Sequence, residues 1–205
     1  MRKTRLLALA LAVVGGSGST AGRAHAGELD VSLGLDAADS EWEEDHLSYG
    51  SFKLGYRFWQ PWFQLSYVGK LGYASIDERL LTYLSFGPEI RPQLFDRVRP
   101  YARATVVHQH EENVDAVQEQ PFQAMLGVGD GIRHRAGVAG GLGLEIPFSE
   151  HRKGDWYASI DLAATYFPDD RGPHRYLTAG ASLGFNWDFA RPEPAKPAEV
   201  ADARR

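Results

Sequence analysis

Residues 176–189 read YLTAGASLGFNWDF, and this stretch decides the fold. Apolar side chains occupy every second position, and small or polar ones stand between them. The apolar set is Leu177, Ala179, Leu183, Phe185, Trp187 and Phe189. Because successive side chains of a β-strand point to opposite faces, the stretch predicts a strand with one apolar and one polar face. Its length is about that of a tilted membrane strand, roughly 9–11 residues.

Seven further segments show the same alternation. They are residues 28–36, 48–58, 62–74, 80–91, 98–108, 133–148 and 156–167. The resulting even number of strands is what single-chain bacterial membrane barrels require. We therefore predict an all-β fold over residues 27–189, an eight-stranded antiparallel transmembrane β-barrel of up-and-down topology.

The polar faces of these strands carry many charges. They include Lys53, Arg57, Glu89, Arg91, Arg99, Arg103, Glu145, Asp161 and Asp188. A water-soluble barrel points its apolar face inward, so it would leave these charges outside and an apolar pocket within. We expect the reverse, a lumen charge network inside and apolar bands against lipid. An eight-stranded lumen is just wide enough for its own side chains, although the sequence does not assign the ion pairs.

Aromatic residues gather near the strand ends and predict a girdle at each membrane interface. One group is Trp59, Trp62, Trp156 and Trp187, and the other is Tyr73, Tyr166 and Phe167. Short connections follow the second, fourth and sixth strands, whereas residues 37–47 and 109–132 form longer ones. We predict that the short turns face the periplasm and the longer loops face outside.

The two ends of the chain are expected to lie outside the barrel. Residues 1–26 combine a basic start, an apolar run and Ala24-His25-Ala26, the pattern of a cleaved secretory signal peptide. Residues 190–205 are rich in Pro and Ala and predict a disordered tail. Removing residues 1–26 takes away four basic residues and no acidic one, so the net charge changes from −5 to about −9. That charge argues against nucleic acid as a partner.

The chain resembles the small outer-membrane β-barrel family, typified by the barrel of outer membrane protein A and by outer membrane protein X. The resemblance covers roughly residues 27–189 and rests on the alternating strands and on three motifs. The motifs are Pro100-Tyr101, Gly141-x-Gly143 and Phe185-x-Trp187-x-Phe189. The last is similar to the aromatic β-signal of the family, although sixteen residues follow Phe189 here. The resemblance implies the Gram-negative outer membrane, with its lipid, lipopolysaccharide and assembly machinery as partners.

This architecture does not by itself fix a function. We expect a monomeric structural or surface-interaction protein whose outer loops contact an extracellular partner. We expect no catalytic residues, no cofactor and no metal. Two alternatives remain, a narrow gated pore for ions or small solutes and a lipid A-modifying enzyme. The chain has His108, His110 and His134 near the predicted outer end, and none of these three begins a His-x-Ser motif.

Two further patterns lie near the predicted outer end. His108 and His110 share one face of an extended strand, and Glu111 and Glu112 follow them, but two ligands at this spacing are a weak metal signal. We expect them to be ordinary surface histidines. The acidic stretch 36–45 surrounds Trp42. It either binds divalent ions that bridge lipopolysaccharide, contacts a partner through Trp42, or is solvated.

Overall fold

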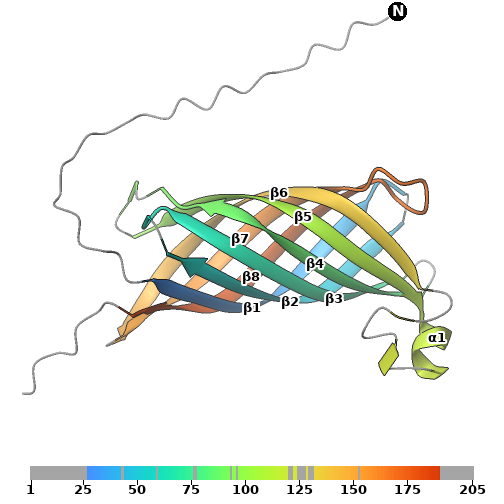
Figure 1. Ribbon diagram of the computed structural model, residues 1–205, viewed down its shortest axis with the longest axis horizontal. Helices are drawn as coiled ribbons and strands as arrows, with labels where there is room; N and C mark the ends of the chain where they lie inside the picture. Colours follow the sequence, from blue (N-terminus) through green and yellow to red (C-terminus); the bar gives the residue numbers. More distant parts are fainter. Residues whose placement is uncertain are drawn as a thin grey trace, which may run out of the picture.

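A computed structural model shows the eight strands in one closed barrel (Figure 1). It describes residues 27–189 except 43, 59, 76–77, 93, 96, 120–121, 124–127, 129–131 and 152. The predicted signal peptide and tail lie outside the described residues. The elements are β1 (Glu28–Ser40), β2 (His46–Arg57), β3 (Phe63–Ala74), β4 (Arg79–Ile90), β5 (Arg99–Asn113), α1 (Val114–Glu119), β6 (Arg133–His151), β7 (Gly154–Tyr166) and β8 (Arg175–Asp188).

Every strand is antiparallel to its neighbours, and β1 pairs with β8 to close the ring. This closing ladder runs from Glu28 opposite Asp188 to Ser40 opposite Tyr176. Each strand therefore has a partner on both sides, which removes the unpaired sheet edge that lipid does not tolerate. The predicted fold class is confirmed. Within the described part of the chain, no helix is long and apolar enough to cross a membrane.

The two ends of the barrel differ (Figure 1). The start of β1 and the end of β8 lie at one end, which we call the terminus end. The end of β1 and the helix α1, which directly follows β5, lie at the other end, which we call the loop end.

Apolar side chains cover the outer wall, and charged ones are buried inside. Leu33, Leu142 and Leu183 point outward and are 69%, 67% and 61% exposed, whereas Asp30 and Glu89 have no exposed surface. Soluble proteins rarely expose apolar patches beyond a few hundred Å². The sorting is instead that of a barrel with an apolar band against lipid and a polar interior.

The girdle aromatics that the structure describes, with the exception of Phe167, point outward. At the terminus end, Trp156 packs against Phe185 with ring centroids 5.0 Å apart, and Phe185 against Trp187 at 6.0 Å. The exposed girdle residues are Trp62, Trp156 and Trp187 at this end and Tyr73 and Tyr166 towards the loop end. Trp59 lies outside the described residues. The predicted β-signal residues Phe185 and Trp187 share the outward face of β8, Phe189 is exposed one residue past its end, and the role of the three in insertion stays a prediction.

Phe167 does not join the outer girdle, contrary to the prediction. Its side chain is fully buried, and the guanidinium carbon of Arg135 lies 4.4 Å from the centre of its ring. Tyr166 points outward, so the alternation of the strand, continued by one residue, turns Phe167 inward. The Phe167 ring packs edge-on against Tyr176, with centroids 5.8 Å apart.

The predicted loops 37–47 and 109–132 are too long, because strands occupy their ends. β1 continues to Ser40 and β5 to Asn113. The inward side chains of these extensions are buried, among them Ala38 on β1 and Gln109 on β5. Ala38, Gln109 and Glu111 therefore continue the inward face of the barrel.

Two glycines of β6 provide a matched test of this inside-outside assignment. Gly143 faces inward opposite Tyr101, and a Cβ added there would overlap the tyrosine ring, whereas nothing lies within 4 Å of a Cβ added to Gly140. We expect Gly143→Ala to lower the free energy of unfolding by about 1–3 kcal/mol through overpacking. Gly140→Ala should change it by no more than about 0.5 kcal/mol. Urea unfolding in lipid vesicles measures both, and equal effects would contradict the assigned faces.

Candidate functional site

The lumen near the terminus end is filled by ionic groups around Arg91, here called the Arg91 cluster. Arg91 directly follows β4, and its Nε lies 2.5 Å from Glu89 Oε1. Its Nη2 lies 2.6 Å from Asp30 Oδ2 and 2.7 Å from Glu145 Oε1. Lys53 Nζ adds contacts of 2.9 Å to Asp30 and 3.5 Å to Glu145. Three buried carboxylates thus share two cations, and each charge depends on its partners because little water reaches it.

Neutral side chains complete the hydrogen bonding of this cluster. Gln64 Nε2 donates to Asp30 over 3.0 Å, and Gln64 Oε1 accepts from Arg57 over 3.2 Å. The Tyr157 hydroxyl donates to the other oxygen of Asp30. Arg57 also pairs with Glu28, at 2.5 Å, towards the terminus end. The cluster is therefore a connected network drawn from several strands.

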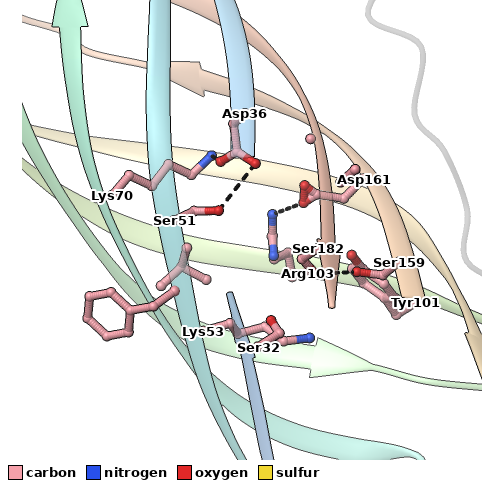
Figure 2. A pocket seen from close by; sticks show the side chains of 14 residues that line it. Ser32, Asp36, Ser51, Lys53, Lys70, Tyr101, Arg103, Ser159, Asp161 and Ser182 are labelled. Carbon is pink, nitrogen blue, oxygen red and sulfur yellow. Dashed lines mark hydrogen bonds and ion pairs between the residues drawn. The ribbon is translucent and has the colours of Figure 1, made fainter. Parts of the chain in front are cut away.

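Two separate ion pairs occupy the middle of the lumen (Figure 2). Lys70 Nζ lies 2.6 Å from Asp36 Oδ2, and Arg103 Nη2 lies 2.6 Å from Asp161 Oδ2. The cavity between these groups has a volume of about 30 Å³. That is room for roughly two water molecules. The middle of the lumen is thus filled by side chains.

A second network, here called the loop-end cluster, fills the opposite mouth. Glu111 accepts from Arg79 over 3.1 Å and from Arg135 over 3.0 Å. Arg79 continues to Asp45 over 3.1 Å, and Arg135 Nε donates to Asp169 over 3.0 Å. The side chains thus come from β4, β5, β6 and two connections. Ion pairs therefore link the strands to the connections at this end of the barrel.

The structure places most of the predicted lumen charges inside the barrel. These are Lys53, Arg57, Glu89, Arg91, Arg103, Glu145 and Asp161. Arg99 and Asp188 lie closer to the mouth of the barrel. They line a recess of about 440 Å³ at the terminus end, where Arg99 Nη1 lies 2.7 Å from Asp155 Oδ2.

Sequence reasoning missed several members of these networks. Asp30 stands on the polar face of the first predicted strand but was not counted among its charges, although it contacts both Lys53 and Arg91. Glu111 was assigned to a loop. Continuing the period of two beyond residue 108 would have placed Gln109 and Glu111 on the inward face.

Three histidines stand on the outer wall near the loop end. His108 and His110 point outward from β5, and His134 lies opposite His110 on β6. These positions follow the last exposed apolar residues of the two strands, Val106 and Val138.

The barrel is similar to solved outer-membrane barrels. The N-terminal β-barrel domain of OprF from Pseudomonas aeruginosa is 18% identical with a TM-score of 0.53, and the match covers 78% of this chain and 97% of that one. Neisserial surface protein A, NspA, is 13% identical with a TM-score of 0.53, over 80% of this chain and 97% of that one. No known sequence family and no curated protein matches the chain. The predicted resemblance to small outer-membrane barrels is confirmed at the level of the fold.

Substitution of two arginines compares the stability provided by the buried Arg91 cluster with that provided by an ion pair at the mouth of the barrel. Arg91→Met keeps most of the side-chain volume but leaves three buried carboxylates short of a cation. We expect it to lower the free energy of unfolding by about 3–5 kcal/mol. Arg99→Met is the control, because the Arg99 side chain is 34% exposed and its pair with Asp155 is worth about 0–1 kcal/mol. The assay is denaturant unfolding in lipid vesicles, and a similar loss in both variants would contradict a special role for the Arg91 cluster.

Proposed function

We propose that this chain, which has the fold of the small outer-membrane β-barrels, is an integral outer-membrane protein whose barrel is a closed anchor. Its loop end faces the cell exterior and carries the contacts of the protein. The observation that supports closure most directly is the ionic filling of the lumen. The Arg91 cluster, the two middle ion pairs and the loop-end cluster follow one another along the lumen.

The outer wall supports placement in a membrane. Exposed leucines cover its middle, and exposed aromatic rings lie towards both ends, where lipid headgroups meet the hydrocarbon. The connections at the terminus end are residues 58–62, 91–98 and 152–153, whereas the longest connection of the barrel, residues 114–132, lies at the loop end. Outer-membrane barrels put short turns in the periplasm and longer loops outside. This rule orients the loop end outward.

The ion pairs favour an anchor over a pore. A permeating ion has to find a continuous wet path, but Lys70 and Arg103 reach their carboxylate partners at 2.6 Å across the middle of the lumen. Opening a path there requires separating buried charges from their partners, which is strongly unfavourable. The closed form is therefore the stable one.

The loop end carries exposed aromatic side chains that suit contact with a partner molecule. Trp42 is 45% exposed in the connection between β1 and β2, and Phe122 is 78% exposed in the connection between β5 and β6. The acidic stretch is less free than its composition indicated, because Asp36 pairs with Lys70 and Asp45 with Arg79 inside the barrel. Exposed aromatic rings on a fixed scaffold suit contact with another macromolecule.

Conductance measurement tests the closed anchor. Protein folded in detergent and added to a planar lipid bilayer is expected to give no single-channel steps, because paired charges fill the lumen. Folding is checked first by gel mobility before and after boiling, and a general porin in the same bilayer is the positive control. Discrete current steps from the folded protein would contradict the proposal.

A further inference from the structure

The β5–β6 ladder brings three imidazoles together on the outer wall. His108 and His110 are two positions apart on β5, so they share a face, and His134 of β6 is the direct partner of His110. Same-face positions of this kind lie within side-chain reach of one another in an antiparallel pair. The ring centroids are 4.6 Å apart for His110 with each of the other two and 5.5 Å apart for His108 with His134.

The ring nitrogens converge on one point. His110 Nε2 lies 2.7 Å and His134 Nδ1 lies 3.4 Å from His108 Nε2, and one nitrogen from each ring falls within 4.8 Å of the others. A neutral imidazole has a single acceptor nitrogen, whose one lone pair lies in the ring plane. One hydrogen bond therefore accounts for one of these approaches but not for both.

A single metal ion accounts for the close approach of all three imidazoles. In a tetrahedral zinc site each nitrogen lies about 2.0–2.1 Å from the ion, so two ligand nitrogens are about 3.3 Å apart. The spacing between His108 and His134 already fits, and that between His108 and His110 has to open by roughly 0.6 Å. Such a change is within the reach of side-chain rotation at the end of a hairpin.

On this face of β5, Glu112 is the nearest candidate in sequence for an outer partner of His110. The second nitrogen of His110, Nδ1, is buried and has no hydrogen-bond partner among the described residues, and the same holds for Glu112 Oε1. Glu112 is two positions further along the same face of β5. Metal-bound imidazoles commonly donate their other N–H to a carboxylate, directly or through water. The two unpartnered atoms are complementary in this sense.

We propose that His108, His110 and His134 bind one divalent transition-metal ion of the zinc type, with a further position left to water. The ion ties β5 to the first residues of β6, which extend beyond the last pair of β6 with β7, Val138 opposite Tyr166. It thereby holds both ends of the 114–132 connection together. This site goes beyond the proposed closed anchor and does not depend on it, since the three histidines lie outside the lumen.

Zinc titration tests the site. The full folded chain, in detergent and without a histidine tag, competes for Zn²⁺ with a chromophoric chelator. We expect one ion per chain. Each of His108→Gln, His110→Gln and His134→Gln should weaken binding by more than the roughly tenfold to 100-fold loss that removal of an outer-shell partner causes. His46→Gln is the matched control, because His46 is an exposed histidine paired with Asp39 away from the cluster, and it should leave binding unchanged.

Two further measurements keep a folding defect apart from a lost ligand. Each variant is first shown to be folded by its gel mobility before boiling. Zn²⁺ should then raise the denaturant midpoint of the parent protein and of His46→Gln but not that of the three cluster variants. Absence of binding by the folded parent protein would overturn the proposal, as would full binding by any cluster variant or an equal loss in His46→Gln.

Discussion

Closure of the ring by the β1–β8 ladder is the constraint on which the rest of the structure depends. Once every strand is paired on both sides, the backbone needs no hydrogen bond from lipid, and every strand sends alternate side chains into one narrow tube. The charges on those inward faces cannot reach bulk water. They must therefore pair with one another. The densest pairing is around Arg91, which contacts three carboxylates.

The same constraint links stability to function. Some ion pairs of the lumen, such as Arg91 with Asp30 and Arg103 with Asp161, join strands that are not neighbours in the sequence, so they hold the wall together beyond the contacts of the backbone ladder. They also occupy the space through which a solute would pass. A barrel built in this way is a rigid support, and its capacity for specific contacts lies in the connections at the loop end and on the outer wall.

The sequence predicted what depends on alternation and missed what depends on register. The period of two sorts Leu183 outward and Glu145 inward whatever the neighbouring strand is. It does not say that Arg91 meets Asp30 across the lumen, because that contact depends on how far each strand is displaced along its neighbours. His134 joins His110 for the same reason. The long connection between β5 and β6 leaves their register open, so the sequence showed a pair of histidines where the structure brings together three.

The inside-outside sorting of the wall can be measured directly, because the chain has no cysteine and single ones can be introduced for spin labels. Labels at consecutive positions along β8, residues 177–183, report collision with oxygen dissolved in the lipid of a vesicle. The account predicts high oxygen accessibility at Leu177, Ala179, Ala181 and Leu183 and low accessibility at the three positions between them. Uniform accessibility along β8, or the opposite alternation, would contradict it.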